Sequence, residues 1–181
     1  RIGMIGRDFF THSVPFFTEP LLEHRDRAAF AITLYHTATN TDATTERFKH
    51  LADRFRQAAW MGESDLVAQI RADGIDVLID LAGHTANTRL PILHLRPAPL
   101  QMSYCGYPAT TGVAAVDVRI VDSLTDPAPE ADAAAVEGPI DSAHVPSDGG
   151  LAVALAEAVG RFGVGARVFL DEIVADAGID V

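Results

Sequence analysis

The stretch Ile75-Asp76-Val77-Leu78-Ile79-Asp80-Leu81 decides the fold of this 181-residue chain. It is rich in β-branched residues and almost continuously apolar, which is typical of a central strand that is covered on both faces of a parallel sheet. The pair Asp73-Gly74 just before it suits a left-handed helix cap, so a helix over about residues 64–72 is expected to end there. The stretch therefore predicts the middle of an α/β domain.

Strand-like and helix-like segments alternate on both sides of this run. Further strands are expected at residues 2–5, 29–35, 57–61, 100–104 and 116–121. Helices are expected at 16–22, from Thr41 or Asp42 onward with Phe48, Leu51, Ala52 and Phe55 on one face, and after Thr85, where Pro91 is awkward. This alternation predicts an α/β fold with a doubly wound, Rossmann-like parallel sheet.

The charge is distributed unevenly along the chain. The net charge is -11, and residues 122–181 hold 12 of the 25 acidic residues but only two of the 14 Lys and Arg. This balance argues against nucleic acid and anionic membranes as partners. The shift in charge also predicts a domain over 1–125, an acidic linker over 126–150 and an atypical tail over 151–181. Helices are expected in the tail at 151–159 and 168–177.

Several classes of protein are disfavoured. No run approaches the roughly 18–20 apolar residues of a membrane span. The chain has a single cysteine, Cys105, and its first residues have the pattern of a strand rather than of a signal peptide. Both features predict a cytoplasmic location. There is no Walker A pattern, and residues 160–165 do not form the dinucleotide fingerprint. No two Asp residues are separated by one position, and no local pair of histidines suggests a metal site.

Three loops are expected to carry the chemistry, because ligands of open parallel sheets bind beyond the carboxyl ends of the strands. These loops are residues 6–13, 82–85 and 106–112. In the first, Asp8 and His12 are four residues apart, and either could accept a proton from an alcohol nucleophile. The alternatives are that Asp8 caps the next helix and that His12 is a surface or core-edge histidine.

The other two loops have both functional and structural interpretations. Gly83-His84-Thr85 could hydrogen-bond a polar ligand, although Thr85 could equally cap a following helix. The loop from Gly106 to Gly112 contains a proline and two threonines, and its glycines would let backbone amides approach a ligand. In isolation it would pass for an ordinary turn.

Taken together, the motifs resemble the protein O-GlcNAc transferase family, which includes the plant SPINDLY proteins. The motifs are Asp8-Phe9-x-x-His12, residues 73–85, Arg96-Pro97-Ala98-Pro99-x-Gln101, and Gly106-Tyr107-Pro108-x-x-Thr111-Gly112. The resemblance covers about residues 1–130, the amino-terminal half of the family's catalytic region. It implies one Rossmann-like half of a GT-B glycosyltransferase.

The resemblance also implies an activity. Family members transfer N-acetylglucosamine from UDP-GlcNAc to protein Ser or Thr hydroxyls, with inversion and without a metal or other cofactor. By the same resemblance, Asp8 and His12 are the catalytic candidates. Gly106, Pro108, His84 and Thr85 are the substrate-binding candidates. Cys105, in place of a bulky aliphatic residue, and Ala109, in place of a frequent glycine, depart from the family pattern.

The resulting hypothesis is a partial glycosyltransferase that is inactive alone. It would lack the UDP-binding carboxyl-terminal half, which neutralises the departing UDP, and the family's tetratricopeptide repeats. One alternative is a non-catalytic binding module that retains the fold. Another is an unrelated metal-assisted enzyme that uses His12, His84 and a distant carboxylate.

Overall fold

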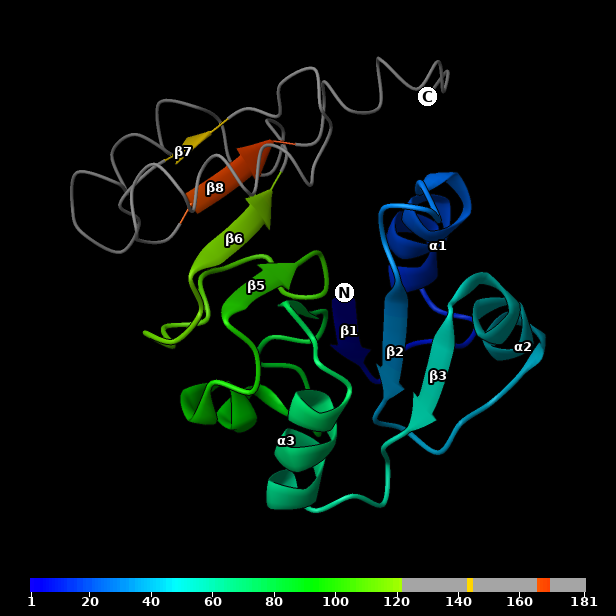
Figure 1. The fold of residues 1–181 in the computed structure, drawn as a ribbon, viewed down its shortest axis with the longest axis horizontal. Helices are drawn as coiled ribbons and strands as arrows, with labels where there is room; N and C mark the ends of the chain where they lie inside the picture. The colour runs from blue at the N-terminus through cyan, green and yellow to red at the C-terminus, as the bar shows by residue number, and fades with distance from the viewer. Residues whose placement is uncertain (122–142, 145–165, 170–181) are drawn as a thin grey trace. The chain divides into compact units, whose positions relative to one another are not determined.

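The computed structural model describes residues 1–121, 143–144 and 166–169. The chain divides into two compact units, residues 1–115 and 116–181. In the first unit five parallel strands form a sheet in the order β3-β2-β1-β4-β5 (Figure 1). These strands are β1 (Ile2–Gly6), β2 (Ile32–His36), β3 (Arg54–Gln57), β4 (Val77–Asp80) and β5 (Leu100–Tyr104).

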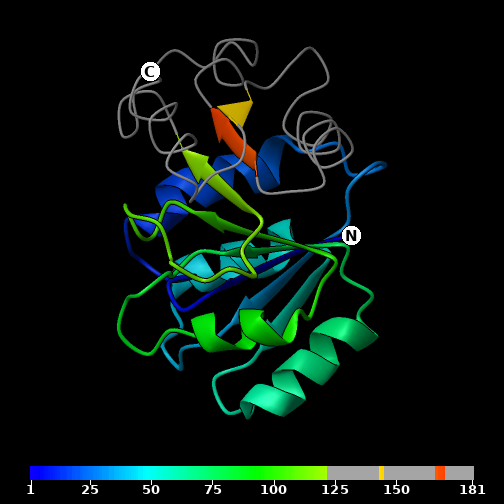
Figure 2. The ribbon, with the colours of Figure 1, turned by 90° about the vertical axis from the view of Figure 1, so that its left-hand side faces the viewer.

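Helices connect the strands and cover the sheet of the first unit. They are α1 (Val14–His24), α2 (Ala43–Leu51), α3 (Glu63–Ala72) and the 3-10 helix η1 (Leu90–Leu95). α1 packs against α2, and α3 packs against η1. Figure 2 shows α1 on one side of the sheet and α3 with η1 on the other. Strand order reverses between β1 and β4, and right-handed crossovers on either side of that point place helices on both faces. The predicted doubly wound α/β fold is confirmed.

Strand β4, from the stretch that predicted the fold, lies between β1 and β5. Three of its four residues, including Asp80, are buried. Asp80 is aligned with Ile5 of β1 and Ser103 of β5. The expected left-handed cap before β4 is also present, because Gly74 has a φ of 65°. Burial on both faces explains why this strand reads as an apolar run rather than as an alternating one.

The sequence pattern placed Phe55 on the same helix as Phe48, and this prediction is wrong. α2 ends at Leu51, and Phe55 lies in β3. The backbone turns because Asp53 N–H donates to Ile32 O at 3.0 Å, which brings the chain alongside β2. The Phe55 ring then packs against His36, at 5.8 Å between centroids. Helical spacing was present, but sheet pairing determined the conformation.

Other boundaries also differ from those predicted. β3 ends at Gln57, so a strand over 57–61 is wrong. No helix follows Thr85 directly. Instead, turns precede η1, and Pro91 lies in its first turn, where a missing N–H costs nothing. α1 extends beyond the predicted 16–22 at both ends and retains Pro20 inside it.

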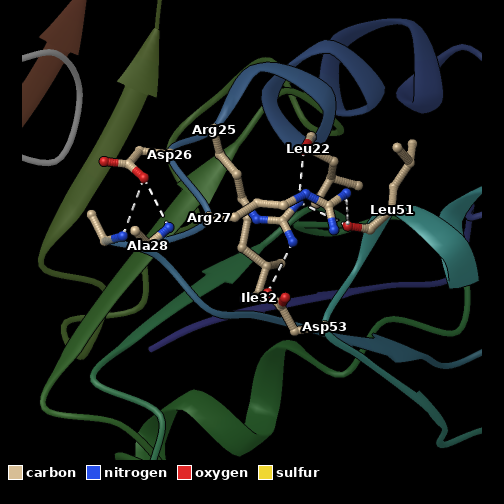
Figure 3. A network of polar contacts seen from close by, with 9 residues as sticks. Leu22, Arg25, Asp26, Arg27, Ala28, Ile32, Leu51 and Asp53 are labelled. Atoms are coloured by element: carbon tan, nitrogen blue, oxygen red, sulfur yellow. Dashed lines mark hydrogen bonds and ion pairs between the residues drawn. The ribbon is translucent and has the colours of Figure 1, made fainter.

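A buried arginine holds three segments together at the amino-terminal edge of β2 (Figure 3). Arg25, whose side chain is 4% exposed, donates to the carbonyls of Leu22 and Leu51 at 2.6 and 2.8 Å and to Asp53 Oδ2 at 2.9 Å. The same Asp53 oxygen accepts from Ile32 N–H at 2.6 Å. One guanidinium therefore links the end of α1, the end of α2 and the start of β2.

The second unit contains the parallel strands β6 (Val118–Val121), β7 (Ala143–His144) and β8 (Ala166–Phe169), in the order β6-β8-β7. A helix over 168–177 is wrong at Val168 and Phe169, because both pair with the apolar strand β6. The remainder of that helix, the helix at 151–159 and most of the linker at 126–150 lie outside the described residues. The division at 1–125, 126–150 and 151–181 stays a prediction. In the described part of the chain, no helix combines the length and hydrophobicity that crossing a membrane requires.

Candidate functional site

A pocket of about 320 Å3 lies beyond the carboxyl ends of β1, β4 and β5 in the first unit. It is lined by Arg7, Asp8, Phe10, His12, Ser13, Val14, Phe17, Thr85, Cys105 and Gly106. β1 and β4 are the strands between which the sheet order reverses, which is where open α/β sheets bind ligands. The structure thus brings four of the six predicted site residues, Asp8, His12, Thr85 and Gly106, around one space.

The loop from β1 to α1 is anchored by Phe9. Its side chain is fully buried and packs against the rings of Phe48 and His36, at 5.5 and 5.9 Å between centroids. Its two neighbours, Asp8 and Phe10, line the pocket. Burial of one aromatic side chain between them therefore fixes the direction of the candidate catalytic loop.

Asp42 holds the same loop from the side of α2. It caps that helix in a capping box with Thr45, and its Oδ2 accepts from Thr11 N–H at 2.8 Å. The hydrogen bonds from Thr11, followed by those from the first turn of α2, lower the pKa of Asp42 to about 2. The helix cap and the candidate catalytic loop are therefore joined through one carboxylate.

Asp42→Ala is expected to lower thermal stability and to broaden the amide NMR signals of Thr11 and His12. A carboxyl with a lowered pKa in the folded state stabilises the fold above its unfolded pKa of about 4, and this contribution is lost as pH falls toward 2. Melting curves between pH 7 and pH 2.5 should consequently show a larger acid-dependent loss in the wild type than in Asp42→Ala. Equal losses would contradict this role.

Asp8 presents a carboxylate to the pocket beside a fixed arginine. Its side chain is 13% exposed, and Oδ1 lies 3.5 Å from Nε of Arg7. Arg7 also donates to the carbonyl of Ala86 at 2.6 Å, which connects the β1 loop to the β4 loop. The arrangement offers an acceptor for a hydroxyl proton, with its counter-charge already in place.

His12 is exposed at the start of α1, and its ring orientation limits its chemistry. Its Nδ1 accepts from Val14 N–H at 3.3 Å. In the neutral ring the proton is then on Nε2, so His12 offers the pocket an N–H donor. This geometry favours Asp8 over His12 as the proton acceptor, a distinction that the four-residue spacing left open.

Thr85 lines the pocket but does not cap a helix. Its N–H donates to Ala82 O at 3.1 Å within a turn, and η1 starts five residues later. The hydroxyl Oγ1 is buried and has no hydrogen-bond partner among the residues that the structure describes. A buried, unpaired hydroxyl at a pocket wall is available to a polar ligand.

His84 and Pro108 do not line the pocket. The Nε2–H of His84 donates to Thr111 O at 2.6 Å, and its ring packs edge-on against Tyr107 at 5.2 Å between centroids. His84 therefore connects the second loop to the third rather than meeting His12. Across residues 1–121, 143–144 and 166–169, no three His, Cys, Asp or Glu side chains are grouped so that they could hold a metal ion.

Gly106 permits a very close approach between two strand ends. A Cβ on Gly106 would lie 1.7 Å from Leu81 O, at the end of β4. The preceding residue, Cys105, lies in the pocket wall with a left-handed φ of 47°. Burial, together with the negative charge of Asp80, raises the pKa of the Cys105 thiol to about 12. Cys105, which departs from the pattern of the resembled family, thus places a protonated thiol at this wall.

Sequence reasoning missed several residues of the site. Arg7 and Phe17 line the pocket, and the buried Asp80 accepts from Gly83 N–H in the loop that leads to Thr85. Phe17 could have been found from its place one helical turn after Val14. Asp80 had a signal too, because an acidic residue interrupts the apolar run of β4 at its carboxyl end.

Comparison with known proteins identifies the family to which this chain belongs. Residues 1–137 match Glycosyl transferase family 41. The chain belongs to that family. It is 42% identical over 131 residues to the probable UDP-N-acetylglucosamine–peptide N-acetylglucosaminyltransferase SPINDLY of Arabidopsis thaliana, a match covering 70% of this chain and 14% of the relative. The corresponding enzyme of Caenorhabditis elegans is 33% identical, with 70% and 11% covered.

A solved structure agrees with this family 41 assignment. The K341M mutant of the Thermobaculum terrenum O-GlcNAc transferase superposes with a TM-score of 0.66 at 36% identity, covering 67% of this chain and 24% of that one. The predicted resemblance to O-GlcNAc transferases and SPINDLY proteins is confirmed. The chain spans only 14% and 11% of the lengths of the two curated family 41 relatives named above.

The carboxyl-terminal part of this family 41 chain has a second likeness. Residues 99–180 match the AIR synthase related protein, C-terminal domain. The two matches overlap over residues 99–137. The change in charge composition near Asp122 falls inside that overlap.

Proposed function

We propose that the first unit forms one wall of a cleft in which N-acetylglucosamine is transferred from UDP-GlcNAc to Ser or Thr hydroxyls of proteins. The observation that carries this proposal is the pocket in which Asp8, His12, Thr85 and Gly106 meet in a family 41 chain. The names of the two relatives reported above support this choice of substrates, because both are UDP-N-acetylglucosamine–peptide N-acetylglucosaminyltransferases by name.

Asp8 is the proposed proton acceptor. In a single in-line displacement, the acceptor hydroxyl oxygen bonds to the anomeric carbon while the bond to the UDP oxygen breaks. The hydroxyl proton passes to the Asp8 carboxylate. His12 holds the sugar or the acceptor by donating from Nε2, because its Nδ1 is occupied by Val14 N–H.

A second half of the enzyme is proposed to stabilise the leaving group. UDP departs with two negative charges, which need cationic or helix-terminal groups nearby. The cation in the pocket lining is Arg7, and it already faces Asp8 and holds Ala86. For this reason we propose that the chain is inactive alone. We further propose that the first unit is one half of a GT-B enzyme that needs no cofactor beyond the donor substrate.

The proposal is tested by adding UDP-GlcNAc and a Ser/Thr peptide to the isotopically labelled chain. We expect no turnover above background, while the amide signals of Asp8, Thr85 and Gly106 shift on titration with N-acetylglucosamine or UDP-GlcNAc. Turnover would contradict the need for a second half. Shifts confined to other parts of the sheet would contradict the assignment of the pocket.

His12→Ala should weaken binding of UDP-GlcNAc at this pocket by about five- to tenfold. The expected loss is one hydrogen bond of about 1 kcal/mol or slightly more. The matched control is His24→Ala, which removes an exposed histidine from the other end of α1. Chemical-shift titrations of both variants at pH 8 check this. Equal affinities would exclude a direct contact from His12.

A non-catalytic binding module is the second candidate. It is favoured by the match of residues 99–180 to the AIR synthase related protein, C-terminal domain, which is a different family from family 41. Such a module would bind a protein or peptide partner without affinity for UDP-GlcNAc. Peptide-dependent shifts at the pocket with no response to UDP-GlcNAc would favour this candidate.

A further inference from the structure

Asp80 is a buried carboxyl group that the proposed transfer chemistry does not use. It is the last residue of β4 and is 2% exposed. Its Oδ2 accepts from Gly83 N–H at 2.6 Å. Burying a carboxylate is costly, and here burial raises the pKa to about 6 against the opposing effect of the Gly83 and Ala82 N–H groups.

The turn that Asp80 holds leads directly into the pocket wall. Gly83 adopts a left-handed φ of 51°, and a Cβ there would lie 2.3 Å from Cβ of Tyr107. Two residues later, Thr85 lines the pocket with its buried hydroxyl unpaired among the described residues. The position of that hydroxyl depends on the turn, and the turn depends on the acceptor beneath it.

Asp80 also faces the third loop. The titratable groups near it are His84 on its own turn and Cys105 after β5. From β1 the aligned neighbour is the apolar Ile5. Asp80 forms no ion pair within the part of the chain that the structure describes, and the backbone N–H groups of Gly83 and Ala82 hold its carboxylate. A carboxylate is suited to this because both of its oxygens accept, whereas an amide keeps one acceptor oxygen and has an N–H₂ group that only donates.

We infer that Asp80 is a positioning residue of the pocket, which holds the Gly83–Thr85 turn so that Thr85 Oγ1 and the Gly106 backbone can meet a polar ligand. This inference deepens the proposed function and rests on it for the identity of the ligand. Protonation of Asp80 removes one acceptor site from the turn. The pocket is consequently in its binding geometry when Asp80 is ionised and loosens when it is neutral.

The first test follows the carboxyl group directly by NMR in the full chain. The Asp80 Cγ signal should titrate with a midpoint of about 6, the value given by its raised pKa. The amide signals of Gly83, Thr85 and Gly106 should follow with the same midpoint in the wild type. They should lose that transition in Asp80→Asn. If the amide signals of Thr85 and Gly106 do not change as Asp80 ionises, the inference is overturned.

The second test measures UDP-GlcNAc affinity between pH 5 and pH 8. Wild-type affinity should fall by about three- to tenfold toward pH 5, which corresponds to about one hydrogen bond. Asp80→Asn should show the weaker affinity throughout, with a smaller pH dependence, and should melt no lower than the wild type at pH 8 because a buried charge has been removed. A lower melting temperature with a wild-type pH profile would show a purely structural role and overturn the inference.

Asp76 offers a matched control for Asp80. Asp76→Asn changes the same residue type near the start of the same strand, where the side chain is 61% exposed, and should leave the pH profile unchanged. If UDP-GlcNAc fails to bind at any pH, the proposed function fails. The Cγ and amide titrations still decide whether Asp80 positions the turn.

Discussion

Gly106→Ala is expected to lower the free energy of unfolding by about 3 kcal/mol or more, because overpacking against rigid backbone has no inexpensive relaxation. The added Cβ would lie 1.7 Å from Leu81 O and 2.8 Å from Leu81 C. Both atoms belong to the main chain, and Leu81 N–H is bonded to Ile5 O at 2.9 Å. Relief therefore requires the ends of β4 and β5 to separate, and the wall of the pocket moves with them.

Urea unfolding of Gly106→Ala and Gly112→Ala checks this prediction. Gly112 has a left-handed φ of 65°, but a Cβ there would meet no atom within 4 Å. Its replacement should cost about 1–2 kcal/mol, from backbone strain alone. If the two variants lose the same stability, the close approach of the third loop to β4 is not what Gly106 provides.

Arg25→Ala should destabilise the first unit by about 2–4 kcal/mol, with little direct effect on the pocket. The substitution leaves two carbonyls, of Leu22 and Leu51, without their donor and leaves Asp53 without its cation (Figure 3). Removing one partner of a fully buried ion pair costs about 3–5 kcal/mol. The value expected for Arg25→Ala is lower because the Asp53 side chain is 39% exposed. The effect should appear in urea unfolding at pH 7.

Arg27→Ala is the matched control for Arg25. Arg27 also donates to Leu51 O, at 3.2 Å, but from an exposed position. Its removal should change the free energy of unfolding by about 0.5 kcal/mol or less. A comparable loss in both variants would mean that net charge near α1, rather than the buried network, is responsible.

Much of the fold could be predicted because its main elements are encoded locally. β5 spans residues 100–104 as predicted, and α3 ends at the Asp73-Gly74 cap. The central strand is recognisable because two covered faces demand an unbroken apolar run. Phe55 shows the limit: helical spacing continued through it, but pairing with β2 placed it in a strand.

The candidate site was predicted in outline for a similar reason. Loops that follow parallel strands meet at one edge of the sheet, so Asp8, Thr85 and Gly106 were expected near one another from topology. Which side chains enter the pocket is a different matter. His84 faces Thr111, and the Nδ1 of His12 is occupied, and neither fact follows from spacing in the sequence.

The sequence by itself determined the central strand, the alternation that makes a doubly wound sheet, and the family whose motifs its loops carry. Only the tertiary structure decided that Asp80 accepts from Gly83 N–H, that Gly106 lies against the main chain of Leu81, and that Asp8 lines the pocket beside Arg7. The physical reason is the distance along the chain between the residues that interact. Strand and helix patterns arise from neighbours along the chain, whereas burial, close approach and hydrogen-bond partners depend on residues that folding brings together.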